Sequence, residues 1–183
     1  MNKRITLPTL LTWTRIFLIP VFVAVFYVPD NLLTIMNKNL IATAIFLLAM
    51  LTDYLDGYLA RRLKQESSFG AFLDPVADKA IVAASLVVLV NLNRTFVFAA
   101  IVIIIREIAI SALREWMAQI GKPQNTALAY IGKLKTAVQM IAISLLLFDY
   151  HTQLVGNLFM LVAVMLTVIS MFYYLEQAKK YFN

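Results

Sequence analysis

Six long apolar segments constrain this chain more than any other feature of its sequence. Each is about as long as the roughly 20 residues that an α-helix needs to cross a bilayer. Apolar residues make up 62% of the 183 residues, whereas soluble domains contain about 45 to 50%. The sequence therefore predicts an all-α integral membrane protein, one domain over residues 1–183, with six transmembrane helices. The expected spans are approximately 9–28, 39–63, 70–92, 95–116, 128–149 and 152–176.

Basic residues are divided unevenly between the two sides of the predicted membrane. With a cytosolic N-terminus, 14 of the 16 Lys and Arg residues lie on the cytosolic side, and only Lys38 and Arg94 lie on the other. This bias predicts that both termini are cytosolic. The net charge of +6 is then explained by contact with anionic membrane lipids, so we expect no nucleic-acid partner.

Four of the apolar segments have short charge-free cores. These cores, 39–52, 80–93, 95–105 and 136–148, contain only 11 to 14 residues, fewer than the roughly 20 that a span requires. Each helix must therefore carry charge below the membrane surface, in every case at its cytosolic end. Because ionisable groups inside a membrane need water or partners, the sequence predicts a polar cavity that opens to the cytosol.

Four aspartates lie at the cytosolic ends of the second and third segments. Asp53 and Asp56 share one helix face, and Asp74 and Asp78 lie about 40° apart on the next helix. Carboxylates that converge from two helices repel each other unless cations neutralise them. The chain has no cysteine, and sites made of oxygen ligands favour Mg²⁺, Mn²⁺ or Ca²⁺. A divalent-metal site follows, and two ions are expected.

Small residues and an arginine lie beside these acids. Gly57 and Ala60 are on the same helix face as Asp53 and leave room for a bulky group to approach the backbone. Arg61 adds a fixed positive charge. Metal-binding carboxylates, small residues and an arginine together indicate a site for a phosphate ester, since phosphoryl transfer depends mainly on positioning and charge neutralisation.

The spacing of these residues resembles that of a known family. The chain contains the pattern D-x2-D-G-x2-A-R-x8-G-x3-D-x3-D and in this respect is similar to CDP-alcohol phosphatidyltransferases. The resemblance implies six transmembrane helices, a homodimer and a divalent-metal site, occupied by Mg²⁺ or Mn²⁺, in a cytosol-facing cavity. It also implies metal binding by Asp53, Asp56, Asp74 and Asp78, and binding of CDP-diacylglycerol by Gly57, Ala60, Arg61 and Gly70.

The reaction that the resemblance implies needs no covalent enzyme intermediate. Asp78 would act as the general base and remove the proton from an alcohol hydroxyl. The alcohol would then attack the β-phosphorus of CDP-diacylglycerol, and CMP would leave with its charge stabilised by metal.

The segments "LPTLLTWTRIFLIP" and "IREIAISALREWMAQIGKPQNTALAYIGKLKTAVQM" resemble bacterial members of the family that use sn-glycerol 3-phosphate. This likeness implies a location in the bacterial cytoplasmic membrane. A phosphorylated acceptor needs additional cations, and four residues are expected to supply them: Arg106, Arg114, Lys133 and Lys135.

Other interpretations of these cations remain open. Arg114 is equally well explained as a charge that sets topology, and Lys133 and Lys135 point about 200° apart on a helix. Glu107 can simply pair with a neighbouring cation. Thr12 and Arg15 can face the nucleotide or a lipid phosphate, but an arginine that extends toward the membrane interface is the preferred explanation of Arg15.

Two other classes of function compete with a transferase. A divalent-cation transporter would use the four acids, but its pathway should avoid neighbouring arginines and lysines. A non-catalytic scaffold has no need for acids inside its helices. Within the transferase class, enzymes that make phosphatidylinositol phosphate, phosphatidylserine or cardiolipin share the four acids and differ in their contacts to the acceptor.

Overall fold

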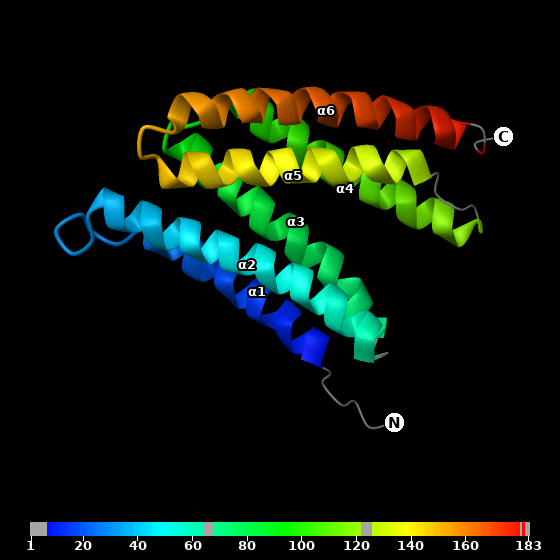
Figure 1. The fold of residues 1–183 in the computed structure, drawn as a ribbon, viewed down its shortest axis with the longest axis horizontal. Coiled ribbons are helices and arrows are strands. Elements are labelled where there is room, and N and C mark those ends of the chain that lie inside the picture. Colours follow the sequence, from blue (N-terminus) through cyan, green and yellow to red (C-terminus); the bar gives the residue numbers. More distant parts are fainter. Residues whose placement is uncertain (1–6, 64–67, 122–125, 180, 182–183) are drawn as a thin grey trace. The chain divides into compact units, whose positions relative to one another are not determined.

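The computed structural model describes residues 7–63, 68–121, 126–179 and 181, with the side chains of 7–9, 56–63, 68–72 and 126–131 excepted. Within these residues the chain is helical and contains no strand, which confirms the all-α prediction. The helices in Figure 1 follow the predicted segments closely. They are α1 (Leu7–Val25), α2 (Ile35–Leu63), α3 (Ser68–Asn91), α4 (Val97–Gln119), α5 (Thr126–Phe148) and α6 (Gln153–Lys179).

Left-handed backbone conformations follow the ends of three helices. Asn93 (φ 56°) follows α3, Gly121 (φ 69°) follows α4 and Asp149 (φ 56°) follows α5. Glycine adopts this conformation without strain, and Asn and Asp tolerate it better than other residues. The helices thus end at these polar segments of the sequence, because Asn93, Gly121 and Asp149 can adopt a positive φ that a helix does not allow.

The chain divides into two compact units, Met1–Val88 and Leu89–Asn183. In the first unit, α1 packs against α2. Ala42, Phe46 and Ala49 of α2 are buried at spacings of three and four residues, the spacing that places side chains on one helix face. Phe22 of α1 is also fully buried.

In the second unit, α6 packs against both α4 and α5. The buried residues of α6 recur every three or four positions and form one face: Gly156, Met160, Ala163, Thr167, Ser170, Tyr174 and Ala178. At Gly156 the helices approach closely, since an added Cβ would lie 2.8 Å from Cδ2 of Leu146. This face of α6 carries the polar residues that matter for the candidate site.

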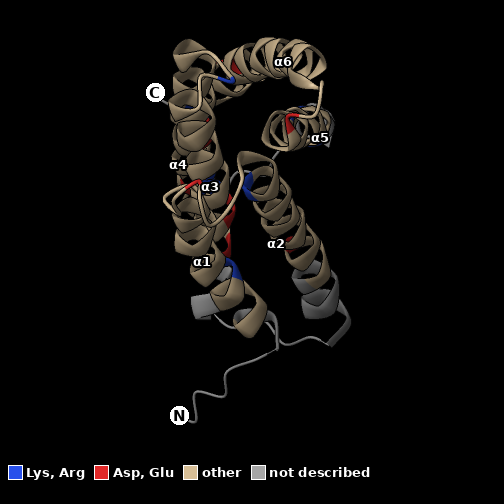
Figure 2. Ribbon diagram, turned by 90° about the vertical axis from the view of Figure 1, so that its left-hand side faces the viewer, with Lys and Arg blue, Asp and Glu red and all other residues tan. Residues whose placement is uncertain are grey.

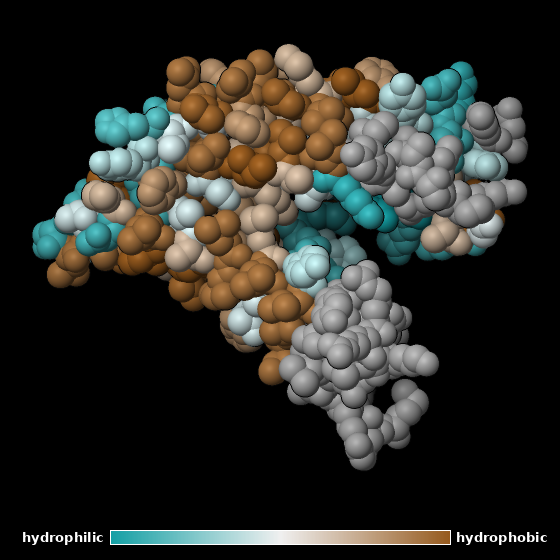
Figure 3. Space-filling model, viewed as in Figure 1, coloured by the Kyte–Doolittle hydropathy of each residue, from teal (hydrophilic) through white to brown (hydrophobic). Residues whose placement is uncertain are grey.

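Two described segments are long and apolar enough to cross a membrane, Ile35–Leu55 of α2 and Gln153–Lys179 of α6. Large apolar side chains of α6 are exposed, among them Leu154 at 84% and Phe172 at 65%. Figure 3 shows a mainly apolar surface over α5 and α6, and charged residues are sparse on the helices in Figure 2. An apolar surface of this extent indicates contact with lipid or another protein.

The two basic residues predicted to lie outside the cytosol are both buried and paired. Nζ of Lys38 lies 2.6 Å from Oδ1 of Asp30. Nη2 of Arg94 lies 3.0 Å from Oδ2 of Asp149. Nη1 of Arg94 donates hydrogen bonds to the carbonyl oxygens of Leu146 and Leu147 at the end of α5. Burial lowers the pKa of the Arg94 guanidinium from its ordinary value, and the charge of Asp149 opposes this shift.

We expect Arg94→Gln to destabilise the protein by about 3 kcal/mol, because it breaks a buried ion pair and leaves the carbonyls at the end of α5 without their donor. Thermal unfolding of the purified protein in detergent measures this change. A melting temperature equal to that of the wild type would mean that Arg94 does not stabilise the end of α5.

Candidate active site

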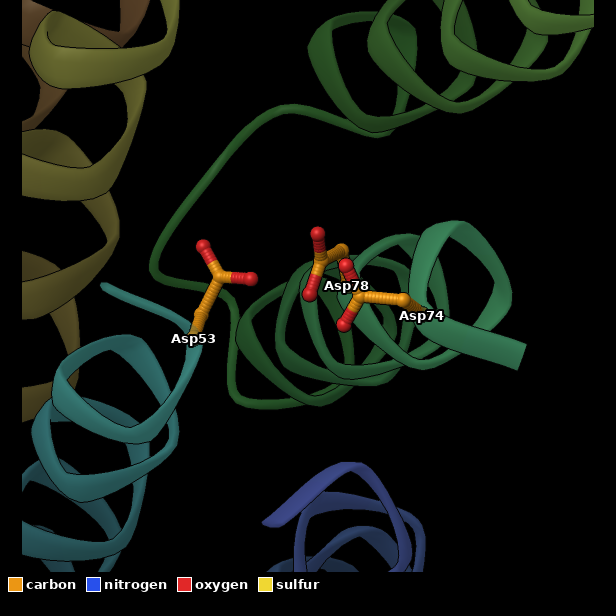
Figure 4. Close-up of side chains that lie close together, drawn as sticks. All are labelled: Asp53, Asp74 and Asp78. Atoms are coloured by element: carbon orange, nitrogen blue, oxygen red, sulfur yellow. The ribbon is translucent and has the colours of Figure 1, made fainter. Parts of the chain in front are cut away.

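Three of the four predicted acids lie together. Asp53 comes from α2, and Asp74 and Asp78 lie one turn apart on α3, so that both point to the same side of that helix. Figure 4 shows Asp53 directed toward the other two side chains. One carboxylate oxygen from each residue lies within 4.8 Å of the others. The convergence predicted from helix spacing is therefore confirmed for these three aspartates.

The three carboxylates fit a hard divalent cation. Their side chains are 45%, 38% and 38% exposed for Asp53, Asp74 and Asp78, so an ion can reach them and keep some of its water. Oxygen ligands with retained water are what Mg²⁺ and similar ions prefer. The site can thus hold a metal ion with Asp53, Asp74 and Asp78 as ligands.

The remaining predicted residues of this region are described by their backbone alone. Asp56, Gly57, Ala60 and Arg61 belong to α2, and Gly70 belongs to α3, but their side chains lie outside the described part of the structure. Their roles in binding metal and CDP-diacylglycerol stay predictions.

The position of Arg15 on α1 differs from the one predicted from the sequence. The prediction that it extends toward the membrane interface is wrong, because its side chain is fully buried. Its Nη1 donates to Oδ1 of Asp53 at 2.8 Å and also to Asp78, and its Nη2 donates to Asp74. The first unit thus places one guanidinium in contact with three carboxylates.

A second polar cluster lies in the other unit. Lys135 of α5 is buried and its Nζ donates to Oε1 of Glu107 on α4. Arg106, also of α4, places its Nη1 3.8 Å from Oε2 of Glu107. Its Nη2 donates to Oγ of Ser170 at 2.9 Å, and its guanidinium lies 5.7 Å from the ring centroid of Tyr174. Glu107 therefore joins two buried cations, and α6 holds one of them.

The structure separates the four predicted acceptor-binding cations into two pairs. Arg106 and Lys135 are buried and belong to the cluster around Glu107. Arg114 and Lys133 are exposed, and none of the described hydrogen bonds or ion pairs joins them to the Glu107 cluster. Nε of Arg106 is buried without a hydrogen-bond partner among the described residues. The Glu107 cluster thus retains capacity to bind water or a polar ligand.

Comparison with known proteins identifies the family of this chain. The sequence pattern of CDP-alcohol phosphatidyltransferases matches residues 5–169. The chain belongs to this family. The match includes the three aspartates and also Arg106, Glu107 and Lys135, whereas Ser170 and Tyr174 lie just beyond its end.

Members of the CDP-alcohol phosphatidyltransferase family from several bacteria are similar over almost their whole length. A relative from Haemophilus influenzae is 46% identical over 180 residues, which are 96% of this chain and 95% of that protein. Relatives from Wigglesworthia glossinidia brevipalpis (44% identical, 93% of each chain) and Pectobacterium atrosepticum (46%, 94% of each) are equally close. All three are named CDP-diacylglycerol--glycerol-3-phosphate 3-phosphatidyltransferase.

Sequence reasoning did not assign Ser170 and Tyr174 to the site of this family member. Both lie on the buried face of α6, four residues apart. Polar side chains at helical spacing within an apolar segment were the available signal. Their partner Arg106 is more than 60 residues away in the sequence, so the spacing by itself did not identify it.

We expect Glu107→Gln to destabilise the protein by about 3 kcal/mol, since it leaves the buried charges of Lys135 and Arg106 without their shared carboxylate. The double variant Glu107→Gln/Lys135→Met should recover part of this loss, because one buried charge is removed as well. Thermal unfolding in detergent measures both changes. The exposed Glu115 provides the control Glu115→Gln, and equal melting temperatures for the two single variants would contradict the assigned role of Glu107.

Proposed function

We propose that this protein transfers the phosphatidyl group of CDP-diacylglycerol to sn-glycerol 3-phosphate and releases CMP. The proposal rests on the convergence of Asp53, Asp74 and Asp78. It also rests on the similarity of nearly the whole chain to relatives named CDP-diacylglycerol--glycerol-3-phosphate 3-phosphatidyltransferase. The products are phosphatidylglycerol phosphate and CMP, so the reaction belongs to phospholipid biosynthesis.

The first unit is proposed to bind the metal and the donor. Asp53, Asp56, Asp74 and Asp78 would hold Mg²⁺ or Mn²⁺, with two ions per site. Divalent cations bound there supply Lewis-acid polarisation of the diphosphate and compensate the charge of the leaving CMP. The cytidine diphosphate group would be held by Gly57, Ala60, Arg61 and Gly70.

Asp78 is the proposed general base. Its carboxylate accepts the proton of the glycerol 3-phosphate hydroxyl, and the oxygen forms a bond to the β-phosphorus of CDP-diacylglycerol. The bond between this phosphorus and the bridging oxygen of CMP breaks, and the electron pair leaves with CMP. Because the acceptor attacks directly, no side chain forms a covalent bond to the lipid.

The second unit is proposed to recognise the phosphate of the acceptor. Arg106 and Lys135 are buried cations that share the single carboxylate Glu107, so the cluster has an excess of positive charge. A phosphate monoester neutralises that excess, whereas inositol or serine brings no comparable anion to do so. Arg114 and Lys133 stay predicted as additional contacts.

We further propose that both units belong to one membrane domain over residues 1–183, with six spans and cytosolic termini, in the bacterial cytoplasmic membrane. The family match, which runs across both units, supports a single domain. The distribution of basic residues supports the orientation, because 14 of the 16 Lys and Arg residues lie on the predicted cytosolic side. The cytosol-facing polar cavity, the homodimer and the contact with membrane lipids stay predictions.

The contacts of Arg15 favour a transferase over a cation transporter. A pathway for divalent cations through Asp53, Asp74 and Asp78 would meet the buried positive charge of Arg15, which would raise the barrier to passage. A phosphate-ester site instead requires cations beside its acids.

An acceptor panel tests the proposed substrate. Purified protein with Mg²⁺ or Mn²⁺ should release CMP from CDP-diacylglycerol when glycerol 3-phosphate is supplied, and much less with inositol, serine or phosphatidylglycerol. Radiolabelled donor or a coupled CMP assay measures the release. Equal rates with an uncharged acceptor would overturn the assignment of glycerol 3-phosphate.

Asp78→Asn tests the proposed base. We expect turnover to fall by at least about 100-fold, since positioned bases typically contribute 10² to 10⁴ in rate, while binding of CDP-diacylglycerol is largely kept. Steady-state CMP release and equilibrium binding of the donor separate these effects. The control Glu176→Gln makes the same change from acid to amide at an exposed residue of α6 and should retain activity; normal turnover by Asp78→Asn would show that the base is another group.

A further inference from the structure

Arg15 contacts every described member of the acidic cluster. Its two terminal nitrogens donate to Asp53, Asp74 and Asp78, and no part of its side chain is exposed. The carboxylates themselves remain more than one-third exposed. The guanidinium therefore approaches the acids from inside the protein, while the acids remain open to solvent.

The burial of Arg15 follows from the face of α1 on which it lies. Thr12, Arg15, Phe22 and Val25 are all buried, and at about 100° per residue they fall on one side of the helix. The side that carries Arg15 is thus the packed side of α1. Packing of this side of α1 therefore fixes the guanidinium beside the three aspartates, which would not be the case for a cation at the surface.

The guanidinium and a metal ion require the same three carboxylates. Arg15 donates to Oδ1 of all three aspartates, and the oxygens that can hold an ion lie within 4.8 Å of one another. Because like charges at such short range repel strongly, an ion and the guanidinium cannot keep the same contacts. One of them must give way.

We propose that Arg15 is a positioning residue that occupies the carboxylates of the metal-free protein and competes with the divalent cation for them. This inference rests on the proposed function, since it takes the three aspartates as the metal site. In the absence of an ion, Arg15 keeps three mutually repelling carboxylates close together. When an ion binds, the guanidinium gives up these hydrogen bonds, so the ion meets ligands that are already assembled.

Arginine suits this role because its planar group carries five donors in a fixed arrangement and remains charged. A lysine carries one compact ammonium group and contacts several carboxylates less effectively. Arg15→Lys should therefore weaken the competition in part, and Arg15→Gln should remove it.

Mn²⁺ binding to the purified full-length protein tests the proposal without an activity measurement. Electron paramagnetic resonance of free Mn²⁺ gives the dissociation constant. We expect Arg15→Gln to bind Mn²⁺ about 10-fold more tightly than the wild type, within the 5- to 150-fold range of typical coupling between sites. Arg15→Lys should lie between the two.

Thermal unfolding provides the second measurement. In EDTA, Arg15→Gln should melt at a lower temperature than the wild type, because its carboxylates have lost their cation. Saturating Mn²⁺ should reduce this difference, since the ion then supplies the charge and tighter binding gives greater stabilisation. The matched control is Arg94→Gln, a buried arginine of the other unit, which should lose stability to the same extent with and without Mn²⁺ and leave Mn²⁺ affinity unchanged.

Mn²⁺ affinity that is unchanged or weaker in folded Arg15→Gln would overturn the proposal and leave the proposed function intact. If Arg15→Gln does not fold, an unchanged affinity in Arg15→Lys would overturn it instead. Failure of the wild type to bind Mn²⁺ would overturn both this proposal and the metal site on which the proposed function depends.

Discussion

The pairing of buried charges is the interaction on which the rest of this structure depends. Removing one ion from water costs several kcal/mol even after the protein relaxes, and an apolar helix bundle offers little water to reduce that cost. Arg15 meets three aspartates, Lys135 meets Glu107 and Arg94 meets Asp149. Each of these pairs connects different helices or, for Arg94 and Asp149, two of the turns between helices, so charge neutralisation and tertiary packing are achieved by the same contacts.

Such pairs also connect stability with function. A site for a metal ion or a phosphate must contain charge that its ligand will neutralise, yet the protein must remain folded before the ligand arrives. Arg15 provides the neutralising charge for the three aspartates within the protein. In the proposed exchange an ion replaces Arg15, and its affinity reflects the difference between the two interactions. The exposure of the aspartates beside a fully buried Arg15 fits this exchange.

Local spacing predicted much of the fold and part of the candidate site. The apolar segments became helices that begin and end within a few residues of their predicted limits, because apolar length and polar breaks act locally. Asp74 and Asp78 share a helix face for the same reason. The choice between Lys133 and Lys135 could not be made from spacing, since either face of α5 could have been the buried one. The structure buries Lys135 and exposes Lys133.

The sequence by itself determined the helical class, the limits of the helices and the acids that lie on a common face, because helix periodicity relates residues that are close along the chain. Only the tertiary structure decided which cations serve those acids. Arg15 lies 63 residues from Asp78, and Lys135 lies 28 residues from Glu107. Contacts over such separations depend on which helix faces pack together, and a helix that is apolar on every side carries no local signal to show which face that is.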